Sequence, residues 1–118
     1  MVKSVSDIFK AIFLKRMGVI MNINKKADGD NLVIALEGRL DTTTSPELEK
    51  EIKTSLDGVS SLEIDMTALE YISSAGLRVL LAAQKIMNKQ GTMKVTHAND
   101  DIMEIFDVTG FCDILTIE

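Results

Sequence analysis

Residues 65–78 read Asp65-Met66-Thr67-Ala68-Leu69-Glu70-Tyr71-Ile72-Ser73-Ser74-Ala75-Gly76-Leu77-Arg78. The segment starts at the end of an alternating pattern, in which apolar Leu62, Ile64 and Met66 are separated by acidic residues. A period of two is typical of a strand with one face in the core. A short turn should follow, and then a helix that begins near Ser73 and Ser74 and is apolar over most of residues 77–87. The segment therefore indicates a strand–turn–helix unit.

The alternation of strands and helices extends in both directions from this unit. Expected strands cover residues 22–26, 32–36, 62–66, 93–96 and 114–117. Expected helices begin at Ser45-Pro46, after Ser73, and after Asn99, where Ser45 and Asn99 are the predicted caps and Gly110 ends the last helix. Strands that take turns with helices favour a mixed or mainly parallel sheet. We expect an α/β fold, with a four- to five-stranded mixed sheet packed against three to four helices.

Length and charge limit the classes of function. With 118 residues, of which 46% are hydrophobic, the chain can build one core and one domain. Residues 1–20 carry four basic residues against one acidic residue, whereas the formal charge of the whole chain is −5. The remaining residues are therefore strongly acidic. Because nucleic-acid binding draws most of its affinity from Lys and Arg, we expect no nucleic-acid partner.

The first 20 residues form a segment of their own. Residues 4–17 begin with a capping-box-like Ser4 and Asp7, then place Phe9, Ile12 and Phe13 at helical spacing. One interpretation is a basic amphipathic helix that contacts a membrane surface or a partner. Others are an extra helix packed on this domain or on a neighbouring copy, or a leader before Met21. We assign residues 1–20 to an amphipathic helix or leader and residues 21–118 to the domain.

The usual constellations of enzyme active sites are missing from the sequence. A single histidine, His97, excludes multi-histidine metal sites, and a single cysteine, Cys112, excludes cysteine clusters and an internal disulfide. The nucleotide-binding and Gly-x-Ser-x-Gly motifs do not occur, and no apolar run approaches the roughly 20 residues that span a bilayer. We expect no enzyme, cofactor or metal, a surface or capping role for His97, and a buried Cys112 kept for packing.

The two serines of the quoted segment need more than a capping role. A capping serine accepts an otherwise unpaired backbone N–H, and one serine is enough for this purpose. Gly76 in a first turn is unfavourable by roughly 0.5–1 kcal/mol relative to Ala. Small side chains at Ala75 and Gly76 would let another surface approach the backbone closely. This pattern favours a protein-binding surface at the start of the helix.

Three stretches resemble a known family. Asp65-Met66-Thr67 followed by Ser73-Ser74-Ala75-Gly76-Leu77 is similar to the signature of STAS domains, and specifically of anti-sigma factor antagonists. Glu37-Gly38-Arg39-Leu40-Asp41 with Thr44, and the closing segment 106–111, resemble the other two motifs of that family. The resemblance covers about residues 21–118 and implies a single STAS domain.

The resemblance also implies a mechanism and a set of site residues. Ser74 matches the serine that an anti-sigma factor kinase of the GHKL type phosphorylates, and Asp41 matches a nearby acidic residue, whereas Ser73 departs from the Asp that many antagonists have there. The implied partner-binding residues are Asp41, Thr44, Ser73, Ser74, Ala75, Gly76, Leu77 and Arg78. Unphosphorylated protein would bind the kinase and phosphorylated protein would release it, in the cytoplasm. An alternative is a STAS subunit of a lipid-transport, anion-transport or stress-signalling complex without serine phosphorylation.

Overall fold

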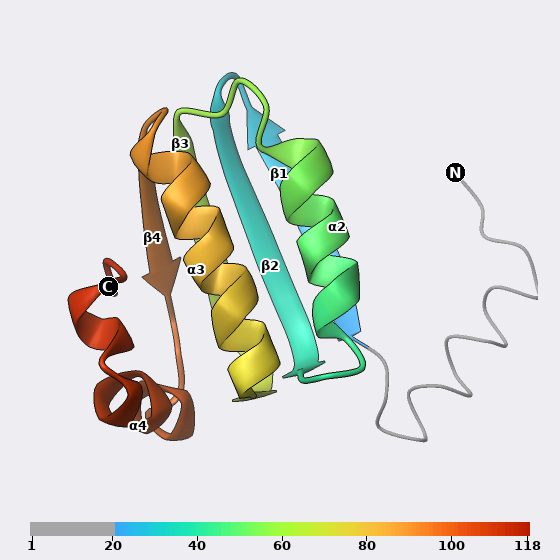
Figure 1. Ribbon diagram of the computed structural model, residues 1–118. Coiled ribbons are helices and arrows are strands. Elements are labelled where there is room, and N and C mark those ends of the chain that lie inside the picture. The colour runs from blue at the N-terminus through green and yellow to red at the C-terminus, as the bar shows by residue number, and fades with distance from the viewer. Residues whose placement is uncertain (1–20) are drawn as a thin grey trace, which may run out of the picture.

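A computed structural model describes residues 21–118 of the chain, which form one four-stranded sheet with helices (Figure 1). The strands are β1 (Met21–Asp28), β2 (Asn31–Leu40), β3 (Ser61–Ile72) and β4 (Thr92–Thr96), and they lie in the order β1-β2-β3-β4. β1 is antiparallel to β2, whereas β2, β3 and β4 are parallel. The predicted α/β fold with a mixed sheet is confirmed. The amphipathic segment predicted at residues 4–17 lies outside the described residues.

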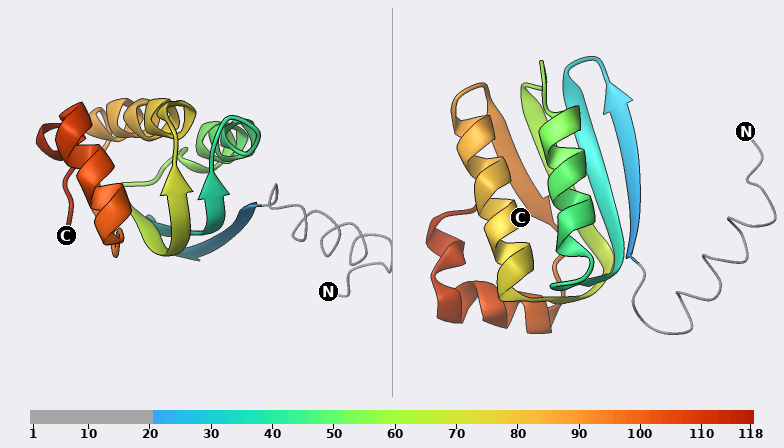
Figure 2. Two further views of the ribbon diagram at one scale, coloured as in Figure 1. Left: turned by 90° about the horizontal axis from the view of Figure 1, so that it is seen from below. Right: turned by 45° about the vertical axis from the view of Figure 1, so that its right-hand side comes forward.

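Two helices form a second layer on one face of the sheet. α2 (Ser45–Ser55) and α3 (Ser74–Asn88) lie side by side on that face, and α4 (Asp100–Thr109) lies at one end of the sheet beyond β4 (Figures 1 and 2). Among residues 21–118, no helix covers the opposite face of the sheet (Figure 2, left). None of the helices in this part of the chain is long and apolar enough to cross a membrane.

The core lies between the sheet and this helical layer. Ile34, Ile64 and Val95 point into it from three neighbouring strands, and each is fully buried. α3 contributes seven buried residues and α2 three, which confirms the prediction that the helix after Ser73 is the more deeply buried. The alternating residues on the other side of the strands, such as Glu63 and Asp65, are only half-buried. The sheet therefore has one apolar face and one polar face.

β2 and β3 are both longer than their sequence patterns predict. The turn expected after Met66 is wrong, because residues 67–72 continue β3 and pair with the end of β2. The pairing contains register shifts between Ala35 and Glu37 and between Gly38 and Arg39. These shifts break the period of two, so that Leu69 and Ile72, three residues apart, are both buried. The two strands thus end together at Leu40 and Ile72.

The helix ends follow the predictions in two cases and differ by one residue in a third. Asn99 caps α4, since its side chain accepts a hydrogen bond from the Ile102 N–H at 2.8 Å, and Gly110 ends that helix in the left-handed conformation with φ of 80°. The cap of α2 is Thr44 and not Ser45, which is already helical.

The C-terminal segment departs from the prediction. The strand expected at residues 114–117 is wrong: a short 3₁₀ helix, η1 (Phe111–Asp113), is followed by a single parallel bridge between Val95 and Ile117. The burial predicted for Cys112 is also wrong, because the thiol lies in this surface 3₁₀ turn and is exposed. The apolar run around Cys112 is therefore only partly used for the core.

Candidate functional site

The candidate site lies where β2 and β3 end and α2 and α3 begin. The carboxyl ends of neighbouring parallel strands meet at one edge of a sheet, and this edge is the usual position of sites in α/β folds. Here the two strand–helix connections are joined directly, since the Ser73 N–H donates a hydrogen bond to the Leu40 carbonyl at 2.9 Å. Residues 33 positions apart in sequence are thereby placed in one local structure.

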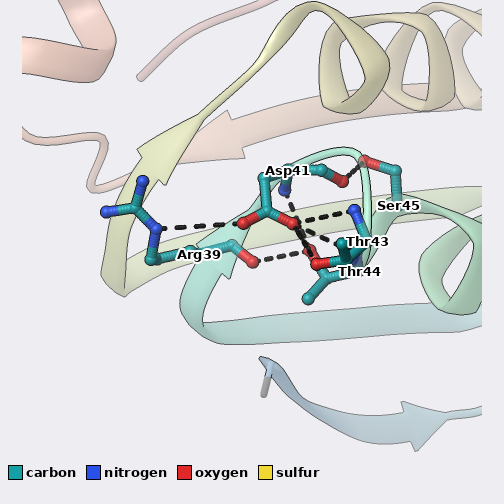
Figure 3. Close-up of polar contacts among 5 residues, drawn as sticks. All are labelled: Arg39, Asp41, Thr43, Thr44 and Ser45. Atoms are coloured by element: carbon teal, nitrogen blue, oxygen red, sulfur yellow. Dashed lines mark hydrogen bonds and ion pairs between the residues drawn. The ribbon is translucent and has the colours of Figure 1, made fainter. Parts of the chain in front are cut away.

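The first connection is a tight loop organised by Asp41 (Figure 3). Its Oδ1 accepts hydrogen bonds from the Thr43 N–H at 3.0 Å, the Thr43 hydroxyl at 2.7 Å and the Thr44 N–H at 3.2 Å. The Thr44 hydroxyl donates to the Arg39 carbonyl at 2.7 Å and accepts the Asp41 N–H at 2.9 Å. Asp41 thus holds the backbone that leads from β2 into α2.

Hydrogen bonding also sets the protonation of Asp41. Partial burial is the largest single influence and raises the pKa of this carboxyl, but the hydrogen bonds from Thr43 and Thr44 together outweigh it, so that the pKa lies below its usual value of 3.8. The second carboxylate oxygen faces the Arg39 Nε at 3.8 Å. Asp41 is therefore an anion at neutral pH, directed toward its own loop and toward Arg39.

Arg39 connects this loop to the end of β3. Its guanidinium lies over the ring of Tyr71, 4.6 Å from the ring centre, and the two residues are register partners in the parallel pair. Such a cation–π contact contributes about 0.5–1 kcal/mol where it is exposed. Tyr71 is one of the few large apolar side chains of the described residues that reach the surface. The two side chains form an exposed border beside the strand ends.

The second connection leads directly from β3 into α3. Ser73 is the cap residue, with extended backbone angles, but its side chain makes no capping hydrogen bond. Its hydroxyl oxygen is buried and has no partner among the described residues. Ser74 is the first residue of α3 and is exposed. The first turn of α3 also contains no acidic residue, so the unpaired N–H groups and the positive end of the helix dipole are not compensated there.

Gly76 explains how α3 can begin so close to β2. A Cβ atom at this position would lie 2.7 Å from Leu40 Cγ and 2.9 Å from Ile72 Cγ1. Gly76 is therefore required by contacts within the domain, where the predicted role was a close approach by a partner. Leu77 is also buried, with 6% of its surface exposed. The inner face of the first turn packs on the strand ends, and its outer face presents Ser74, Ala75 and Arg78.

A groove separates the first turns of the two helices. It has a volume of about 290 Å³ and is lined on one side by Ala75, Arg78, Val79 and Ala82 of α3, and on the other by Thr42, Ser45, Pro46 and Glu49. Arg78 and Glu49 place opposite charges across it. Ser74 directly precedes Ala75, one of the residues that line this groove.

The structure separates the predicted site residues into two sets. Ser74, Ala75 and Arg78 lie at the surface or line the groove, and Asp41 and Ser73 are partly exposed beside them. Thr44, Gly76 and Leu77 are buried and support this surface from within. Sequence reasoning missed Arg39, Tyr71, Thr42, Pro46 and Glu49. The proximity of these residues depends on the register of β2 with β3 and on the packing of α2 beside α3.

Comparisons with known proteins agree with this architecture. Residues 22–118 match the family model described as the STAS domain. An anti-sigma-B factor antagonist of Listeria monocytogenes is 31% identical over 104 residues, which cover 83% of this chain and 90% of the relative. Its name describes a regulatory protein, as predicted, and not an enzyme.

Two solved structures share the fold. An anti-sigma factor antagonist from Mycobacterium paratuberculosis aligns with a TM-score of 0.76 and 23% identity, over 84% of this chain and 86% of that one. The Bacillus cell fate determinant SpoIIAA in its phosphorylated form aligns with a TM-score of 0.66 and 16% identity, over 82% and 91%. Because residues 22–118 match the STAS family model and the Listeria relative is 31% identical, the chain belongs to the STAS domain family.

Proposed function

We propose that this protein is a cytoplasmic anti-sigma factor antagonist that acts by partner switching, with Ser74 as the switch. One observation carries the proposal: Ser74 is exposed as the first residue of α3, beside the groove between α2 and α3. The Listeria relative is named an antagonist of an anti-sigma factor, and SpoIIAA is described in a phosphorylated form. The partner would be an anti-sigma factor with serine kinase activity of the GHKL type.

The position of Ser74 is suited to a phosphate that leaves the fold intact. A phosphate adds a charge of about −1.5 to −2 and bulky oxygens. At the first residue of a helix this charge is stabilised by the free N–H groups and the helix dipole. Arg78 follows four residues later on the same face of α3, where residues i and i+4 are neighbours. The domain should therefore keep its stability when Ser74 is phosphorylated.

The same charge should disfavour a protein interface built around Ser74. Ala75 and Arg78 flank the serine, and a partner that packs against them without a phosphate would meet added bulk and up to two new negative charges. Asp41 is directed toward its own loop and Arg39, so repulsion would come mainly from acidic groups of the partner. A loss of about 2–4 kcal/mol corresponds to a roughly 30- to 1000-fold weaker complex. Release of the partner is the expected output.

The test is to incubate the full chain with ATP and each candidate GHKL-type anti-sigma kinase of its own genome, and then to map the phosphate by mass spectrometry. We expect a single phosphate on Ser74, its loss in Ser74→Ala, and its retention in Ser73→Ala. No modification by any kinase, or modification only at residues 42–44, would refute the assignment.

A second experiment tests the output of the switch. Ser74→Asp should weaken kinase binding at least tenfold in titration calorimetry, while the melting temperature changes by no more than a few degrees. Thr54→Asp is the matched control, because it adds the same charge near the far end of α2. Equal binding by Ser74→Asp and Thr54→Asp would argue against a switch at this position.

A further inference from the structure

The polar face of the sheet carries a compact group of potential metal ligands, away from the Ser74 surface. Glu63, Asp65 and His97 each offer one ligand atom, and these atoms lie within 4.8 Å of one another. Glu63 and Asp65 are two residues apart in β3, so both lie on the face of the sheet that no described helix covers. His97 directly follows β4. The group thus combines two carboxylates with the only imidazole of the chain.

The backbone at His97 explains how the imidazole reaches this face. In β4, Met93 and Val95 point into the core, so a strand continued to residue 97 would direct that side chain to the same side. His97 instead has φ of 61°, the one residue other than glycine with positive φ among those described. Its Nδ1 lies 3.2 Å from Asp65 Oδ1, across 32 positions of sequence. The left-handed backbone at His97 therefore turns its imidazole toward Asp65 of β3.

We propose that Glu63, Asp65 and His97 form a binding site for a divalent transition-metal ion of the zinc class, although the sequence alone predicts no metal site. Zinc takes His nitrogen and carboxylate oxygen at about 2.0–2.2 Å, so neighbouring donors in a tetrahedral site are about 3.3 Å apart. Asp65 and His97 have this separation, at 3.2 Å, in the hydrogen bond that joins them, which a bound metal would replace. The Glu63 carboxylate, whose ligand atom lies within 4.8 Å of the other two, has to move closer to complete the set. Water would complete the coordination.

Neighbouring threonines orient both carboxylates. The Thr67 hydroxyl donates to Asp65 Oδ1 at 2.6 Å, and the Thr96 hydroxyl donates to Glu63 Oε2 at 2.9 Å. Outer contacts of this kind fix the direction of metal ligands and raise affinity.

Lys94 opposes metal binding, so its replacement is one test of the proposal. Its ammonium lies 3.8 Å from Glu63 Oε1, where it would repel a bound cation and compete for the carboxylate. The choice of metal follows from the ligands, because imidazole suits zinc, copper and nickel, while magnesium and calcium prefer all-oxygen sites. We expect zinc to bind and magnesium to bind at least tenfold more weakly.

The test is a titration of the untagged full chain with ZnCl2, followed by calorimetry and by the NMR signals of the single histidine. Cys112→Ser is the background throughout, because the exposed thiol could bind zinc itself. We expect one site per chain, a shift of the His97 ring signals, and a melting temperature that rises with zinc.

Three variants remove one ligand each and keep the local geometry. His97→Asn tolerates the positive φ, Asp65→Asn keeps the acceptor for Thr67, and Glu63→Gln keeps the acceptor for Thr96. Each should weaken zinc binding at least tenfold, Lys94→Met should strengthen it about threefold, and Glu104→Gln on α4 should leave it unchanged. No saturable binding at ~1 mM zinc, or binding that survives His97→Asn with the histidine signals unshifted, would overturn the site.

Discussion

The starts of α3 and α4 are built in opposite ways. α4 has a capping side chain, Asn99, which accepts the Ile102 N–H, and two acidic residues, Asp100 and Asp101, in its first turn. At α3 the cap residue Ser73 makes no side-chain bond and the first turn has no acidic residue. α4 follows the ordinary rules for a stable helix start. The start of α3 departs from them, and such departures are expected where a protein keeps a surface for function.

The largest expected effect tests how closely α3 is fitted to β2. Gly76→Ala should destabilise the domain by about 1–3 kcal/mol, because the added methyl would overlap Leu40 and Ile72. In an unconstrained helix the same change would stabilise by up to about 1 kcal/mol, so the sign is informative. Urea unfolding measures it, and Leu40→Ala is the compensating background. Equal or higher stability of Gly76→Ala alone would contradict the close fit.

The second effect concerns the well-capped helix. Asn99→Ala removes the acceptor for the Ile102 N–H, and also a hydrogen bond from the Asn99 amide to the Leu69 carbonyl at 3.2 Å. We expect a loss of about 1 kcal/mol in the free energy of unfolding. Asn99→Asp keeps the capping oxygen and serves as the control. If both variants were equally destabilised, the amide bond to Leu69 would be the more important contact.

A third, smaller effect is expected from the acid dependence of the Asp41 loop. Because the pKa of Asp41 is lower in the folded than in the unfolded protein, its ionisation stabilises the fold above the usual value of 3.8. This contribution is lost as the pH falls through the lower folded-state pKa. Asp41→Asn should therefore lose less stability between about pH 5 and pH 3 than the parent. Parallel acid titrations of the two proteins would show no difference if Asp41 were not engaged.

The smallest effect is expected at the other cap. Ser73→Ala removes a buried hydroxyl that has no partner among residues 21–118, so stability should stay within about 0.5 kcal/mol or rise slightly. The same measurement on Asn99→Ala provides the direct comparison. A loss near 1 kcal/mol at Ser73 would mean that this serine caps α3 in solution, and would remove the contrast between the two helix starts.

Local signals in the sequence predicted most of the elements but not their full lengths. Alternation identified β3 from Leu62 to Met66, and capping residues placed α3 and α4. The continuation of β3 to Ile72 could not be predicted, because register shifts against β2 break the alternation. The predictions for Cys112 and for segment 114–117 are wrong for a related reason. An apolar run in the sequence does not show how much of it reaches the core.

The candidate site could also be predicted only in part, because local signals do not reveal contacts between residues that are distant in the sequence. Ser73, Ser74 and Ala75 are consecutive, so their placement at a helix start could be inferred from local chemistry. The contact of Arg39 with Tyr71 spans two strands, and the groove depends on how α2 lies beside α3. Gly76 was recognised as unusual, yet its reason, contact with Leu40, is visible only in three dimensions.

The single bridge at Ile117 has a consequence for aggregation. Open sheet edges expose unpaired N–H and C=O groups, which can pair with another molecule. The bridge covers part of the outer edge of β4, since Val95 donates to Thr116 and accepts from Glu118. On β1, at the other edge, the exposed Lys26 provides a charge that discourages such pairing. The last three residues thus cover part of an open sheet edge and disfavour edge-to-edge assembly.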